Sequence, residues 1–243
     1  FIASQLTSVV RRTSSEALEH FSNDLSLEQF NVLQVSPALP SRNVDGQSPG
    51  DSGSIASETL QILDSLDVVV QLDCLQPPTL DALSKQLAVR PGHYHLVHID
   101  AQSNTSGGEI LLESADGGAA NVPSSQVAEL LLKAGVPTVL INGGDTGSSG
   151  VGQEAAAQLS EAGVPLVVSV AAPLTPAARS IFVNNLLRQI VAGVDVPTAT
   201  SVARRAMMDD PLRPSAAGKA PFWDWITLQV YQSREYSPAA IHV

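Results

Sequence analysis

The sequence predicts an α/β fold in which a mainly parallel sheet lies between two layers of helices, and two features of its 243 residues indicate this. First, short apolar runs alternate with segments of helical pattern along most of the chain, which is the order of repeated strand and helix units. Second, the runs at residues 68–70 and 166–168 are valine- and leucine-rich and therefore apolar on both faces of a strand. Such strands are covered on both faces, so the prediction is a three-layer α/β/α sandwich.

The first half of the chain is expected to hold three core strands, one outer strand and three helices. A stretch rich in Ser, Pro and Gly at residues 36–53 is expected to be an exposed loop. Thr79 can cap a helix, because its hydroxyl can accept a hydrogen bond from a first-turn amide. In chain order, we expect a helix at 16–21, a strand at 31–35, a helix at 55–66, a strand at 67–72, a helix at 79–88, a strand at 94–99 and an outer strand at 109–112.

The second half uses one turn sequence twice. Ala-Gly-Val-Pro occurs at residues 134–137 and again at 162–165. In each copy the glycine suits the left-handed position after a helix, and the proline prevents the helix from continuing. Thr175-Pro176 opens a further helix, since a proline in the first turn loses no hydrogen bond. In chain order, we expect a helix at 125–134, a strand at 136–141, a helix at 151–162, a strand at 164–170, helices at 175–193 and 198–208, a Pro-rich loop and a final strand at 225–231.

Composition excludes several classes of partner. The chain has 13 basic and 24 acidic side chains and a formal charge of −11, which repels nucleic acids and anionic membrane surfaces. No apolar run approaches the ~20 residues that a membrane-spanning helix needs. The single cysteine, Cys74, leaves no internal disulfide and fits a reducing compartment, so we expect a cytoplasmic protein. The chain starts at Phe1 without a leader pattern, and we expect it to be a piece of a longer polypeptide.

The strand at 136–141 runs directly into Asn142-Gly143-Gly144-Asp145-Thr146-Gly147. In α/β folds, ligands and catalytic groups gather at the carboxyl ends of strands. No cysteine, lysine or histidine stands at this strand end. The loop at residues 143–152 could hold a phosphate on the next helix, but it matches neither common phosphate-binding pattern and its Asp145 would oppose an anion. The loop therefore has the position of an active site without a reactive side chain.

Two other groups of chemically active side chains are interpreted as structural. His93, His95 and His98 lie within six residues, but the strand period places the first two on one face and His98 on the other. Cys74 has no basic residue near it in sequence, which favours an unreactive thiol. We therefore expect neither a metal nor a cofactor.

The order of these motifs resembles the CHAT family of caspase-like cysteine peptidases. One strand ends in His98-Ile99-Asp100-Ala101-Gln102-Ser103, where the family has a motif of the type His-Phe-Asp-Gly-His-Gly. The later strand ends in Asn142-Gly143-Gly144-Asp145-Thr146-Gly147, where the family has Asn-Ala-Cys-Gln-Ser-Gly or a close variant. Further ordered similarities extend over residues 30–232, at 31–40, 76–83, 161–172, 177–193, 203–206 and 210–232.

The departures from the family pattern fall on the catalytic positions. The resemblance places the first histidine of the motif at His98, the catalytic histidine position at Gln102 and the catalytic cysteine position at Gly144. In the family's dyad the imidazole takes the thiol proton and the thiolate attacks a peptide carbonyl. Gln102 cannot act as a base near neutral pH, and Gly144 has no side chain. The resemblance thus implies a degenerate site, a former cleft made of His98, Asp100, Gln102, Asn142, Gly143, Gly144 and Asp145.

An inactive member of this family is expected to bind a protein or peptide partner, to regulate, or to assemble with further copies of itself. Two alternatives remain: an active peptidase with displaced catalytic residues, and small-ligand binding at loop 143–152. The resemblance also implies two parts, a helical linker or tail of an upstream module at residues 1–30 and a CHAT-like domain at 31–243. Family members commonly follow sensing modules in bacterial proteins.

Overall fold

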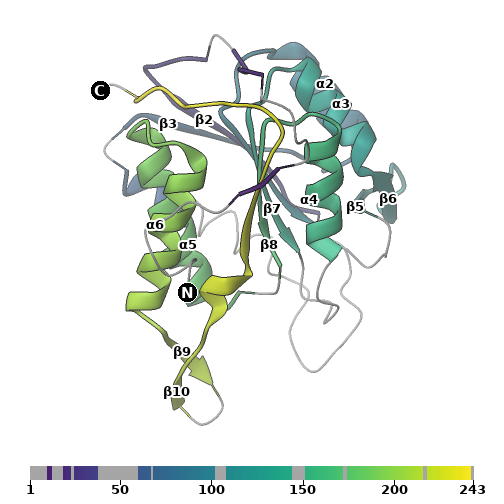
Figure 1. The fold of residues 1–243 in the computed structure, drawn as a ribbon. Helices are drawn as coiled ribbons and strands as arrows, with labels where there is room; N and C mark the ends of the chain where they lie inside the picture. The colour runs from purple at the N-terminus through teal and green to yellow at the C-terminus, as the bar shows by residue number, and fades with distance from the viewer. Residues whose placement is uncertain are drawn as a thin grey trace.

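A seven-stranded sheet forms the centre of the computed structural model (Figure 1). The structure describes residues 10–12, 19–22, 25–37, 60–66, 68–101, 108–143, 151–171, 174–215 and 218–241. The strand order is β1-β11-β8-β7-β4-β2-β3. The five strands from β8 to β3 are parallel to one another, while β11 runs antiparallel to β8 and β1 runs parallel to β11. The strands of this sheet are β1 (Arg11–Arg12), β2 (Phe30–Val35), β3 (Val70–Cys74), β4 (Leu96–Ala101), β7 (Thr138–Gly143), β8 (Leu166–Val170) and β11 (Leu228–Gln232).

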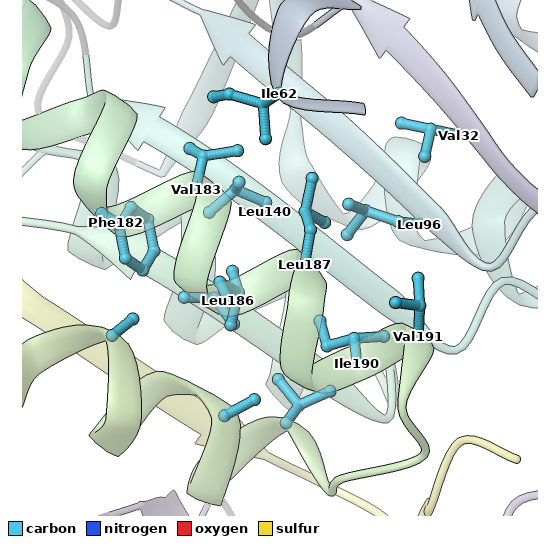
Figure 2. Close-up of a cluster of buried hydrophobic side chains, with 14 of the residues drawn as sticks. Val32, Ile62, Leu96, Leu140, Phe182, Val183, Leu186, Leu187, Ile190 and Val191 are labelled. Carbon is cyan, nitrogen blue, oxygen red and sulfur yellow. The ribbon is translucent and has the colours of Figure 1, made fainter. Parts of the chain in front are cut away.

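Helices cover both faces of the sheet, as the apolar runs predict. One face carries α2 (Leu80–Val89), α3 (Ser124–Lys133) and α4 (Val151–Glu161). The other carries α5 (Pro176–Val191), α6 (Val196–Asp209) and the helical residues 60–64. In Figure 2, Leu186 and Leu187 of α5 lie against Leu96 and Leu140 of the sheet, and all four are buried. The three-layer α/β/α sandwich is confirmed.

The local signals at the helix ends are also confirmed. The hydroxyl of Thr79 accepts from the amide of Ala82, and that of Thr175 accepts from the amide of Ala178 at the start of α5. The glycines of the repeated turn, Gly135 and Gly163, have φ values of 70° and 106°. These left-handed conformations favour glycine, which explains why both turns carry one.

Several elements differ from the expectation. The Pro-rich loop contains a hairpin of β9 (Leu212–Ser215) and β10 (Gly218–Pro221), and the final strand is preceded by a 3₁₀ turn, η2 (Asp224–Thr227). A second hairpin pairs the expected outer strand, β5 (Glu109–Glu113), with β6 (Ala119–Pro123). Residues 19–22 are extended, although the pattern at 16–21 was helical, because His20 bridges to Glu235 in a parallel pairing.

The direction of the chain through the sheet reverses between β2 and β4. The connection from β2 to β3 passes over the α5 face through residues 60–64, whereas the connections β4-α3-β7 and β7-α4-β8 pass over the opposite face. In open α/β sheets such a reversal leaves a crevice at the carboxyl ends of the strands, where ligands bind. The expected position of a ligand site in this fold is therefore at the carboxyl ends of β2, β4 and β7. Among the described residues, no helix is both long and apolar enough to cross a membrane.

Candidate functional site

The carboxyl ends of β4 and β7 lie side by side. Asp100 is the register partner of Asn142, and Ala101 is that of Gly143. Four of the predicted cleft residues, His98, Asp100, Asn142 and Gly143, are thus brought together on adjacent strands. The other three predicted positions, Gln102, Gly144 and Asp145, lie outside the residues that the structure describes.

The polar side chains of this strand pair share the α5 face of the sheet. Ile99 and Ile141 belong to the apolar cluster under α2, α3 and α4. Because side chains alternate along a strand, His98, Asp100 and Asn142 lie on the opposite face. His98 is 2% exposed and Asn142 is 8% exposed. The strand pair therefore presents two buried polar side chains, His98 and Asn142, beneath α5, with the partly buried Asp100 beside them.

One hydrogen bond fixes the tautomer of the His98 imidazole. The Nδ2 atom of Asn142 donates to Nε2 of His98 over 3.0 Å, so Nε2 carries no proton and the imidazole is the Nδ1-protonated tautomer. Burial, with a smaller contribution from the positive charge of Arg179, lowers the pKa of His98 to about 3. The imidazole of His98 is therefore uncharged at neutral pH, and its acceptor atom Nε2 is already used by Asn142.

Opposing effects act on the pKa of Asp100. Burial raises the pKa of its carboxyl group, while the positive charge of Arg179 and a hydrogen bond from the Asn142 side chain lower it, and the net direction is upward. Arg179 comes from the first turns of α5, so this helix supplies a positive charge that acts on both His98 and Asp100. The Asn142 amide thus serves both His98 and Asp100 and orders the group.

The polar group continues onto β2 through Gln34, which is the register partner of His98. Gln34 is 1% exposed, and its Nε2 donates to the hydroxyl of Ser36 over 2.7 Å. Its Oε1 has no hydrogen-bond partner in the described part of the chain. A band of polar side chains thus crosses the carboxyl ends of β2, β4 and β7, the three strands at the reversal of the sheet.

The only cysteine of the chain lies at the edge of this band. Cys74 ends β3 and pairs in register with Gln34, so Cys74, Gln34 and His98 occupy one row across three strands. Two strand spacings separate the backbones of Cys74 and His98 by about 10 Å, and the side chains of one row point the same way. This is far beyond the hydrogen-bond reach that a thiol and its base need. Burial, together with the charge of Asp73, raises the pKa of the Cys74 thiol.

The other two histidines of the predicted cluster have structural partners. Nδ1 of His95 accepts from the amide of Asn31 over 3.1 Å, and its Nε2 donates to the carbonyl of Ser26 over 2.8 Å. The ring of His93 packs edge-on against Tyr94. Within the described ranges, no group of three His, Cys, Asp or Glu side chains could hold a metal ion.

Sequence reasoning missed Gln34 and Arg179. Gln34 is one of two polar residues, with Asn31, in the otherwise apolar strand β2, and polar positions in such a buried strand were a usable signal. Arg179 gave none, because its place near β4 depends on how α5 crosses the sheet.

By sequence, the chain matches no protein family and no curated protein. By structure, it is similar to a crystal structure of caspase-1 from Spodoptera frugiperda, with a TM-score of 0.51 and 9% identity over 95% of this chain and 96% of that one. It is also similar to a structure of pro-Sf-caspase-1, with a TM-score of 0.50 and 12% identity over 93% and 99% of the two chains. The chain therefore has a caspase-like fold.

Proposed function

We propose that this chain is a degenerate, CHAT-like member of the caspase-like peptidases, which binds a protein or peptide partner at the carboxyl ends of β4 and β7 without cleaving it. The observation that carries the proposal is the place of the single cysteine. Cys74 stands on β3, and β2 and β4 lie between β3 and β7 in the sheet. A cysteine peptidase of this fold needs its thiol at the end of β7, where the motif of this chain has Gly144.

The state of His98 supports the same proposal. An imidazole that acts as a general base must be able to take a proton near neutral pH and must reach the nucleophile. His98 is buried, accepts from Asn142 and has a pKa of about 3. Neither His98 nor Gln102 then supplies a base for a displaced nucleophile, and Cys74 is too far from His98 to form a pair with it.

A peptidase assay tests the loss of catalysis. Purified protein is incubated with casein and with a fluorogenic peptide library, and we expect no turnover by the wild type or by Gly144→Trp. Val89→Trp is the matched control, because Val89 is 78% exposed on α2, away from the strand ends. The proposal is contradicted if the wild type and Val89→Trp cleave the substrates and Gly144→Trp does not. If the wild type cleaves the substrates and Cys74→Ser does not, the result supports the alternative of an active peptidase with displaced catalytic residues.

A binding assay tests the second half of the proposal. Peptides selected on the wild type from a phage-displayed library are synthesised, and their affinities are measured by calorimetry. We expect Gly144→Trp to weaken binding by tenfold or more, which corresponds to about 1.4 kcal/mol, while Val89→Trp binds as the wild type does. Equal affinity for all three proteins would place the selected peptides elsewhere and contradict a binding cleft at β4 and β7.

A further inference from the structure

Arg204 on α6 is a buried arginine for which the described part of the chain holds no acidic partner. The residue is 5% exposed, and its Nη2 atom donates to the carbonyl of Leu228, the first residue of β11. Its Nη1 atom is buried too and has no hydrogen-bond partner in the described ranges. Burial lowers the pKa of the guanidinium group, but an arginine keeps its charge at neutral pH. The fold thus places an unpaired positive charge between α6 and β11.

The other buried arginine of the described residues, Arg213, shows how this fold neutralises such a charge. Its Nε and Nη2 atoms donate to the two carboxylate oxygens of Asp224, and its Nη1 atom donates to the carbonyl of Asp210. An unpaired buried charge destabilises a fold strongly, whereas a guanidinium group with a carboxylate or phosphate partner forms charge-assisted hydrogen bonds. Arg204 has a carbonyl partner of the same kind but lacks the anionic partner that Arg213 has.

Three elements meet at the guanidinium group of Arg204, namely α6, β11 and η2. The turn η2 connects the β9-β10 hairpin to β11 and packs against α6 (Figure 1). It ends directly before Leu228, whose carbonyl accepts from Arg204. The acidic side chains within α6 and η2 already have partners, since Asp209 pairs with Arg205 and Asp224 forms the pair described above. The seam between these three elements therefore supplies no counter-ion for Arg204 from its own helix or from the turn.

We propose that Arg204 binds an oxyanion, a carboxylate or a phosphate group, in the seam between α6, η2 and the start of β11. The planar guanidinium group suits the oxygens of either group, and its Nη1 atom supplies the donors. Because Nη1 is covered in this structure, the anion reaches it only when η2 moves away from α6, so anion binding and the packing of η2 are coupled. The inference stands on these three elements alone and does not depend on the cleft at β4 and β7.

Tryptophan fluorescence tests the site in the full chain. The two tryptophans of the protein, Trp223 and Trp225, lie at the start of η2 and within it, so their emission reports a movement of this turn. The wild type is titrated with inorganic phosphate and, separately, with acetate, while sodium chloride keeps the ionic strength constant. We expect a saturable change in emission and a rise in the unfolding temperature that chloride alone does not cause. The anion that binds more tightly identifies the ligand as a phosphate or a carboxylate group.

Two arginine variants separate this site from a general effect of anions on the protein. Arg204→Met removes the guanidinium group, and Arg205→Met is the matched control, because it removes the same charge from the next residue of α6, which is exposed and pairs with Asp209. We expect Arg205→Met to respond as the wild type does, and Arg204→Met to bind the anion about tenfold more weakly or less. The proposal is overturned if all three proteins respond equally. It is also overturned if neither anion changes the emission and the unfolding temperature of the wild type, a result that needs no variant.

Discussion

His98 links two core strands through a buried hydrogen bond. Its imidazole lies at the carboxyl end of β4, yet it is 2% exposed and its Nε2 accepts from Asn142. A buried polar side chain must be hydrogen-bonded to offset its desolvation. The Asn142 amide meets this need for His98 and Asp100 together. In this role His98 joins the core strands β4 and β7.

This role predicts a pH dependence of stability. The pKa of His98 is about 3 in the folded chain and 6.5 ordinarily, so between these values the unfolded chain binds a proton that the folded chain does not. Stability is therefore lost as the pH falls from 6.5 towards 3, by up to about 1.4 kcal/mol per pH unit. We expect His98→Gln, whose side chain can still accept from Asn142, to be less stable than the wild type above pH 6.5 and to close this gap as the pH falls.

Urea titrations of both proteins at several pH values measure the effect. The raised pKa of Asp100 acts in the opposite direction, because folding then favours its protonated form, but it is present in both proteins and cancels in their difference. His20→Gln is the control, since His20 is exposed. A constant difference between wild type and His98→Gln across the pH range would show that His98 does not titrate as described.

Among the elements, the β9-β10 hairpin depends on one buried ion pair. Arg213 is fully buried, and its Nε and Nη2 atoms donate to the two carboxylate oxygens of Asp224 in η2 over 2.7 and 3.2 Å. The pair joins the hairpin to the turn that leads into β11. Prolines 211, 214 and 221 suggested a loop, because proline is rare inside a sheet. A two-stranded hairpin accommodates them, and the Arg213–Asp224 pair could not be foreseen from an eleven-residue separation.

We expect Asp224→Ala to destabilise the chain by about 3–5 kcal/mol, because it leaves the Arg213 guanidinium buried and without its charge partner. Replacing both partners, with Arg213→Met and Asp224→Leu, should recover most of this loss, since no unpaired charge then remains. Lys85→Ala removes an exposed ion pair with Asp81 and should change the free energy of unfolding by less than about 1 kcal/mol. Urea unfolding of the three variants tests these values, and a double variant that is no more stable than Asp224→Ala would contradict a coupled pair.

The elements with strong local signals were predicted well. Helices α2 and α5 begin after Thr79 and Thr175, as their capping side chains indicated. The repeated turn ends α3 and α4 at the expected glycines. The errors fall where the decisive partner is distant in sequence. The extended conformation at residues 19–22, for example, depends on hydrogen bonds to Glu235, about two hundred residues away.

At the scale of the whole molecule, the sequence predicted the three layers of the fold. The apolar runs required two helical layers, and the family resemblance placed His98 and Asn142 in one former cleft. The strand order decided the rest. It places Cys74 two strands from His98, while the path of α5 over the sheet brings Arg179 to Asp100, and neither relation can be derived from local pattern.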